Sequence, residues 1–234
     1  MLEQLLATEV ASYELFTDPQ GVRLLAAEEA LVRNSVASRR REFTTGRHCA
    51  RMALARLGLP SDRSILSGQR GEPVWPAQVR GSITHCRGYR AAAVARVTEI
   101  ASVGIDAEPD EQLPGGVLRA VTLPEEEVRT KELSRDFPLV HWDRILFSAK
   151  ESVYKTWYPL THRPLEFDDA TIEIDPANGT FAARILPHAT RGVHQAPKGF
   201  TGRWTIQGGL VITAIAVPAA AHSPYRQLVG SRAM

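Results

Sequence analysis

Cysteine is scarce in this chain. Of its 234 residues only Cys49 and Cys86 are cysteines, and their separation fits no metal-binding motif. Two such thiols argue against a disulfide framework and are typical of a reduced protein, so we expect a cytoplasmic location.

Long hydrophobic runs are also missing. The longest apolar stretch, residues 209–221, contains Thr213 and Pro218 and is too short to span a bilayer. The first residues have neither a basic segment nor an apolar core, so no signal peptide is expected. We therefore expect no association with a membrane.

An excess of charge of one sign is lacking as well. The chain has 28 basic and 26 acidic residues, a net charge of +2, and only 7% of its residues are aromatic. This composition does not favour a basic groove with stacking aromatic side chains, so nucleic acid is not an expected partner. The length and the 44% hydrophobic content suit a soluble protein with one large domain or two small ones.

Two acidic residues stand at the end of a strand-like run that begins at Ser102. Because side chains alternate along a strand, Asp106 and Glu108 point to the same face. Paired carboxylates repel each other unless a cation lies between them, and a divalent ion with oxygen ligands is the usual remedy. The alternative is two solvated acids where the strand runs into a turn at Pro109.

Further along, residues 142–157 have the pattern of an amphipathic helix, with an apolar stripe at positions 142, 145, 146, 149, 153 and 157. Glu151 and Lys155 are four residues apart and share a face, and Lys150 and Tyr154 form a similar pair. Ordinary surface ion pairs would explain this pattern. A third carboxylate and two cations in one stretch of helix would also suit a metal-bound polyphosphate.

The remaining pattern alternates helices and strands. Residues 21–59 predict two helices, near 26–36 and 39–57, and Arg40 and Arg47 share one face of the second. Thr122 and Glu125 resemble a capping box, with Thr122 as N-cap. The predicted strands and hairpins cover residues 82–86, 91–97, 165–174, 180–186, 202–207 and 209–217.

Four motifs in this order resemble the 4′-phosphopantetheinyl transferases. They are the basic segment 39–47, the segments 70–76 and 81–86 (RGEPVWP and GSITHC), the strand end 104–108 (GIDAE), and the helix 142–155 with Trp142 and SAKESVYK. The chain is most similar to the larger, pseudo-dimeric type that activates polyketide and non-ribosomal peptide synthases, and to its actinobacterial members. The resemblance covers roughly residues 20–217.

The resemblance implies an α+β fold of two pseudo-symmetric α+β halves with the active site in the cleft between them. The N-terminal half, residues 1–105, would bind the 3′-phosphate and adenine side of coenzyme A. The C-terminal half, residues 106–218, would hold the metal and the catalytic helix, and residues 219–234 would form a disordered tail. Helices precede strands in each half, although no residue-level repeat is visible. One chain would supply both sides of the cleft, so we expect a monomer.

The implied activity is transfer of the 4′-phosphopantetheine arm of coenzyme A to a serine of an acyl or peptidyl carrier protein, with release of adenosine 3′,5′-bisphosphate. Asp106, Glu108 and Glu151 would hold Mg²⁺, which Mn²⁺ could replace. Magnesium is favoured over zinc because every candidate ligand is a carboxylate. Glu151, directly or through a water molecule, would be the base, and Lys155 could protonate the leaving oxygen.

The residues that the resemblance assigns to coenzyme A form a larger set. They are Arg39, Arg40, Arg47, Arg70, Ser82, Thr84, His85, Lys150 and Lys155. Guanidinium groups suit the 3′-phosphate because each can offer two donors to one phosphate. Helix periodicity favours Arg40 beside Arg47, whereas the motif favours Arg39, and both stay open. A non-catalytic module that binds coenzyme A is the alternative function, and a metal-dependent nuclease is a weaker one.

Overall fold

The computed structural model describes residues 1–193 and 195–219; the expected C-terminal tail lies outside these residues apart from Ala219. In chain order the elements are η1 (Leu2–Leu5), β1 (Ala11–Leu15), α1 (Ala26–Val32), α2 (Ala37–Arg56), β2 (Leu66–Ser67), β3 (Pro73–Val74), β4 (Val79–Cys86), β5 (Tyr89–Arg96), β6 (Ile100–Pro109), α3 (Val117–Val121), α4 (Pro124–Asp136), α5 (Trp142–Thr161), η2 (Phe167–Asp169), β7 (Ala170–Asp175), β8 (Thr180–Ile185), β9 (Gly199–Gln207) and β10 (Leu210–Pro218). None of the described helices is long and apolar enough to cross a bilayer.

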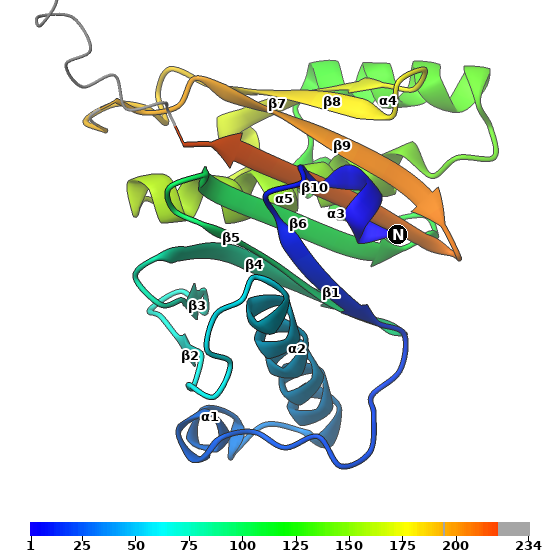
Figure 1. The fold of residues 1–234 in the computed structure, drawn as a ribbon. Coiled ribbons are helices and arrows are strands. Elements are labelled where there is room, and N and C mark those ends of the chain that lie inside the picture. The colour runs from blue at the N-terminus through cyan, green and yellow to red at the C-terminus, as the bar shows by residue number, and fades with distance from the viewer. Residues whose placement is uncertain (194, 220–234) are drawn as a thin grey trace, which may run out of the picture.

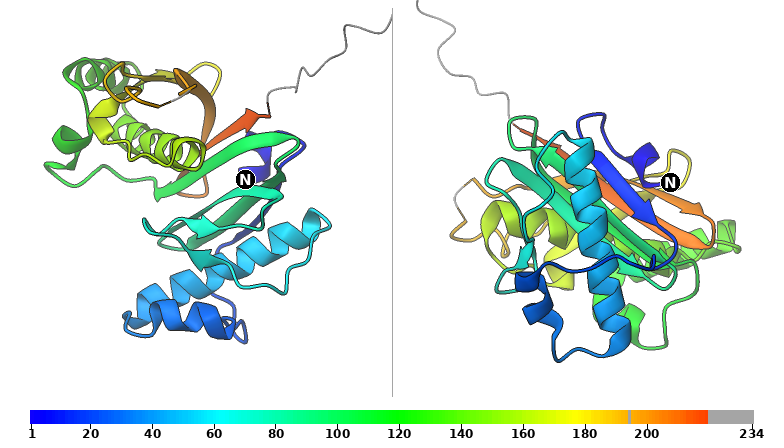
Figure 2. Two further views of the ribbon diagram at one scale, coloured as in Figure 1. Left: turned by 90° about the vertical axis from the view of Figure 1, so that its left-hand side faces the viewer. Right: turned by 60° about the horizontal axis from the view of Figure 1, so that its bottom comes forward.

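Two antiparallel sheets form the centre of the molecule. The smaller has the strand order β1-β5-β4, and the larger has the order β6-β10-β9-β8-β7. Helix α2 packs on the smaller sheet, and α5 packs on one face of the larger (Figure 1). Figure 2 shows α1 and α2 at one end of the molecule and α4 and α5 at the other, with the sheets between them. The expected α+β fold with two halves is confirmed.

The two halves meet along β4 and β6, which are not paired by a backbone ladder. Instead, Ser82 Oγ accepts the backbone N–H of Ile105 at 3.2 Å, and Thr84 Oγ1 accepts that of Ala107 at 3.0 Å. A shared apolar core continues the junction, with the alanines of β5 packed among residues of β6, β10 and η1. Because small side chains allow close approach, β6 is held firmly beside the N-terminal half.

Helix α5 lies unusually close to β6. A Cβ atom on Gly104 would stand 2.2 Å from the carbonyl oxygen of Ser152 and 2.2 Å from Oγ1 of Thr156. The absence of a side chain at this position is therefore a condition for the packing of strand against helix. It brings the end of β6 and the middle of α5 together.

The structure confirms the predicted helices and hairpins, with some changes at their ends. Residues 165–169 are not part of a strand, because Asp169 accepts the N–H of Glu166 in a tight turn and β7 begins only at Ala170. The predicted cap of α4 is wrong by one residue. Glu126, not Glu125, accepts the N–H of Leu123, because Pro124 takes the first helical position.

The expected boundary between the halves, after residue 105, falls inside β6. The whole length of this strand, from Ile100, pairs with β10 in the larger sheet. The side chains of Ser82 and Thr84 then tie the strand to β4. Strand β6 therefore carries contacts from both halves.

Candidate active site

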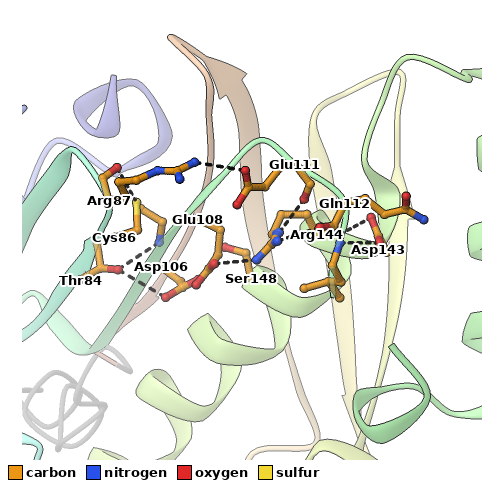
Figure 3. A network of polar contacts seen from close by, with 12 residues as sticks. Thr84, Cys86, Arg87, Asp106, Glu108, Glu111, Gln112, Asp143, Arg144 and Ser148 are labelled. Atoms are coloured by element: carbon orange, nitrogen blue, oxygen red, sulfur yellow. Dashed lines mark hydrogen bonds and ion pairs between the residues drawn. The ribbon is translucent and has the colours of Figure 1, made fainter. Parts of the chain in front are cut away.

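Asp106 and Glu108 lie near the end of β6, where each faces a cation from α5. Lys155 Nζ is 2.7 Å from Oδ1 of Asp106, and Arg144 Nη1 is 3.0 Å from Oε2 of Glu108. Arg144 also donates from Nε and Nη2 to the carbonyl oxygens of Glu111 and Gln112, so it fixes the turn that follows the strand (Figure 3).

One face of α5 supplies these partners. Residues Arg144, Ser148, Glu151 and Lys155 follow spacings of four, three and four, which places them along one stripe of a helix. The sequence pattern identified Glu151 and Lys155 as neighbours on a face. It missed Arg144, although the same spacing extended back by one heptad from Glu151 would have indicated it.

Burial and mutual repulsion dominate the electrostatics of the acids. Burial raises the pKa of Glu108 to about 7, and the nearby Asp106 carboxylate adds to this effect against the opposing influence of Arg144. Burial likewise raises the pKa of Glu151, while Lys155 counteracts part of the shift. Two of the three acids therefore hold their protons more strongly than a solvated glutamate.

Lys155 is the cation between these acids. Burial alone would lower its pKa, but Asp106 and Glu151 outweigh burial, so the pKa of Lys155 lies above its usual value. The ammonium group consequently stays charged at neutral pH and provides a fixed positive charge at this end of β6.

One carboxylate oxygen of Asp106 suits the binding of a divalent cation. Asp106 is 4% exposed, and its second oxygen, Oδ2, is buried without a hydrogen-bond partner among the described residues. A buried carboxylate oxygen without a partner is costly, and a hard cation would satisfy it. No three His, Cys, Asp or Glu side chains in residues 1–193 and 195–219 are already gathered around a common point. Lys155 and Arg144 instead hold Asp106 and Glu108.

Lys150 has partners other than the phosphates expected for it. Its Nζ atom lies 2.6 Å from Oε2 of Glu126 on α4, and it donates to the carbonyl oxygens of Phe167 and Ala170. The side chains of Lys150 and Glu126 are both nearly fully buried. The three donors of the ammonium are thus used in holding α4 and β7 against α5.

A second charged group forms on the N-terminal half. Arg39 Nη1 contacts Nε2 of His85 at 2.7 Å, which joins α2 to β4. Burial and then the charge of Arg39 hold the pKa of His85 below its usual value, and Lys155 contributes in the same direction. His85 therefore contacts the arginine motif, and it also feels the positive charge of the lysine that pairs with Asp106.

The other two candidate arginines of α2 are placed differently. Arg47 is buried, and it donates to the carbonyl oxygens of Ile65 and Leu66 and to Oγ of Ser67. It therefore holds β2 and the residue before it. Arg40 is exposed and forms no ion pair within the part of the chain that the structure describes.

A cavity of about 420 Å³ opens beside these groups. Residues from the β2–β3 connection to β4, including Arg70, Trp75 and Ser82, line one side, and Glu151 and Lys155 of α5 line the other. The expected cleft between the halves is present. The hydroxyls of Ser82 and Thr84 each accept a backbone N–H of β6, and the Thr84 hydroxyl also donates to Oδ1 of Asp106.

Models of two known protein families together match most of the chain. A model of the 4′-phosphopantetheinyl transferase N-terminal domain matches residues 27–95, and a model of the 4′-phosphopantetheinyl transferase superfamily matches residues 102–206. The two matched segments meet at the start of β6, close to the junction of the two halves.

Individual relatives agree with these matches. The chain is 51% identical over 234 residues to 4′-phosphopantetheinyl transferase Svp of Streptomyces mobaraensis. This alignment covers 99% of this chain and 95% of that protein. It is 49% identical over 212 residues to 4′-phosphopantetheinyl transferase PptT of Mycobacterium tuberculosis, covering 88% and 92%. Enterobactin synthase component D of Escherichia coli strain K12 is 33% identical over 188 residues, covering 79% and 80%.

The chain therefore belongs to the 4′-phosphopantetheinyl transferase superfamily and is an enzyme of that class. The resemblance to the actinobacterial members is confirmed.

Proposed function

We propose that this protein transfers the 4′-phosphopantetheine arm of coenzyme A to a serine of an acyl or peptidyl carrier protein, and releases adenosine 3′,5′-bisphosphate. The serine oxygen forms a bond to the phosphorus of the pantetheine phosphate, and the bond from that phosphorus to the leaving bisphosphate breaks. The observation that carries the proposal is the group of Asp106, Glu151 and Lys155 beside a cavity between the halves.

Asp106, Glu108 and Glu151 are the residues that would hold Mg²⁺, or Mn²⁺ in its place. The partnerless Oδ2 of buried Asp106 supports this assignment, as does a candidate ligand set made only of carboxylates. Bound there, the ion would neutralise charge on the diphosphate and on the leaving group. Mg²⁺ dependence follows from this part of the proposal.

Glu151 is the proposed base, directly or through a water molecule. Its raised pKa brings the carboxylate closer to the basicity that proton transfer at neutral pH requires. Lys155 keeps its charge and would neutralise phosphate oxygens, and it is the proposed donor of a proton to the leaving oxygen.

The coenzyme A phosphates would be bound from the N-terminal half. Arg39 and His85 would receive the 3′-phosphate, with exposed Arg40 as a further cation, and their contact at 2.7 Å supports a shared role. Arg70 lines the cavity together with Tyr154 and would add a further positive charge there. Arg47, Ser82 and Thr84 would act by holding the walls of the site. Lys150 would do the same by holding α4, because its donors are already used.

The partners follow from the same arrangement. One chain supplies both sides of the cavity, so we propose a monomer that acts on carrier proteins of polyketide or non-ribosomal peptide synthesis in the cytoplasm. Both cysteines are free, which agrees with a reducing compartment. Neither nucleic acid nor a membrane is part of the proposal.

Mass spectrometry of a purified apo carrier protein tests the proposal. After incubation with the enzyme, coenzyme A and Mg²⁺, we expect the carrier to gain the mass of one phosphopantetheine, and adenosine 3′,5′-bisphosphate to appear in equal amount. Tight binding of coenzyme A with no gain in mass across several apo carriers would support the non-catalytic module instead.

A further inference from the structure

The contact between Arg39 and His85 determines where the imidazole carries its hydrogen. A guanidinium nitrogen can only donate a hydrogen bond, so Nε2 of His85, 2.7 Å from Arg39 Nη1, must be the acceptor. The ring is therefore neutral in the free protein, and its hydrogen is on Nδ1.

Glu42 lies on the Nδ1 side of the same ring. Its Oε2 atom is 3.6 Å from Nδ1 of His85, and the two side chains are 27% and 35% exposed. Oε2 is 3.9 Å from Arg39 Nη1, and Oε1 is 3.9 Å from Arg90 Nη2. One carboxylate of α2 thus stands among a histidine of β4, an arginine of its own helix and an arginine of β5.

We propose that Glu42 is a positioning residue for the 3′-phosphate of coenzyme A, acting through His85: it orients the ring and stabilises the imidazolium that forms when the phosphate binds. The inference rests on the proposed function, because it takes coenzyme A as the ligand of this site. Neither Glu42 nor the uptake of a proton by His85 is part of the proposed function.

The proton balance follows from the geometry. A phosphate that reaches Arg39 competes with His85 Nε2 for the guanidinium hydrogen, and Nε2 then faces a phosphate oxygen with no hydrogen to donate. Uptake of one proton from solvent at Nε2 makes the ring a donor to the phosphate, and Glu42 faces the Nδ1–H of the resulting cation. No bond other than this N–H is made or broken.

The charges around His85 agree with this role. Burial and Arg39 hold the pKa of free His85 below its usual value, with Lys155 of α5 and Arg90 of β5 acting in the same direction. Glu42 acts in the opposite direction and raises this pKa. Removal of the Glu42 charge should therefore weaken the protonated complex specifically.

Calorimetry of coenzyme A binding in buffers of different ionisation enthalpy counts the protons taken up. For the wild-type enzyme slightly above neutral pH we expect net uptake with coenzyme A and less with 3′-dephospho-coenzyme A. For Glu42→Gln we expect reduced uptake and KM for coenzyme A raised about two- to fivefold near pH 8, the size typical of a partly exposed ion pair, with kcat nearly unchanged. At alkaline pH, where the bound imidazole is no longer protonated in either enzyme, the two KM values should converge.

Two matched variants complete the test. Glu29→Gln removes the same charge from an exposed position on α1 and should behave like the wild type. His85→Gln should abolish the phosphate-dependent uptake, so the proposal stays testable if Glu42→Gln folds poorly. Equal uptake in the wild type and Glu42→Gln, or uptake that ignores the 3′-phosphate, would overturn the inference while phosphopantetheine transfer continued. Loss of transfer in the wild type itself would instead overturn the proposed function and this inference together.

Discussion

Lys155 Nζ lies 2.7 Å from Oδ1 of Asp106, and this contact joins the middle of α5 to the end of β6. The two residues are 49 positions apart in the sequence. Asp106 is buried and its other oxygen has no partner within the described part of the chain. A fixed cation therefore occupies one side of the carboxylate and leaves the other side for a ligand.

Replacement of Asp106 by Asn should nearly abolish transfer while the protein stays folded. Asn keeps the size of the side chain and can still accept from Thr84, but it removes the charge that would hold a divalent ion. A lost metal contribution of several kcal/mol corresponds to a fall in kcat/KM of about a thousandfold or more. The rate is measured with apo carrier protein, and circular dichroism confirms the fold. Activity within tenfold of the wild type would contradict the metal assignment.

Replacement of Gly104 by Ala should damage the site without touching its charged groups. The new Cβ would meet the Ser152 carbonyl oxygen at 2.2 Å, so α5 or β6 must shift. We expect a loss of about 2 kcal/mol or more in the free energy of unfolding, since overpacking in a close contact has that effect, together with a fall in kcat. Gly115→Ala is the control, because no atom lies within 4 Å of its added Cβ. Equal stability of the two variants would show that the helix can move freely.

Replacement of Lys150 by Met should act on stability and leave the affinity for coenzyme A nearly unchanged. The change leaves the buried carboxylate of Glu126 without its cation, which typically costs about 3–5 kcal/mol. Adding Glu126→Gln in the same chain should restore part of the loss, and urea denaturation of both variants measures it. If Lys150 bound a phosphate directly, Lys150→Met would instead raise the KM for coenzyme A many-fold in stably folded protein.

The free protein should lose stability on mild acidification, partly through His85. Its pKa is held below the usual value by burial and by Arg39, so the unfolded chain takes up a proton first as the pH falls below about 6.5. Stability is therefore lost as the pH falls through that range and is complete above it. His85→Gln should show a smaller loss between about pH 7.5 and 5.5 in denaturation experiments. An unchanged pH dependence in His85→Gln would mean that other groups control it. His48 is one such group, with a pKa lowered by burial and Arg51.

Much of the site could be predicted from local pattern. Alternation along a strand places Asp106 and Glu108 on one face, and the spacing of four places Glu151 beside Lys155. The same helical spacing also separates the two lysines of the motif. Lys150 and Lys155 are five residues apart, so they point about 140° away from each other around the helix, and they could not both meet the same phosphates.

Other contacts of the site residues are made with segments that no periodic sequence pattern reveals. Arg47 is buried because the short strand β2 and the residue before it supply three acceptors to it, and nothing in the spacing of the arginines predicts that contact. Arg144 pairs with Glu108 because the chain turns back after β6. Tertiary packing thus decides which of several equivalent cations reaches the site.

Binding of Mn²⁺, followed by electron paramagnetic resonance in the presence of coenzyme A, tests the central claim most directly. We expect one ion per chain in the wild type, and binding weakened at least about tenfold in each of Asp106→Asn, Glu108→Gln and Glu151→Gln, because each removes one charged ligand. Glu132→Gln, an exposed acid on α4, should bind like the wild type. Undiminished Mn²⁺ affinity in all three ligand variants would contradict the account.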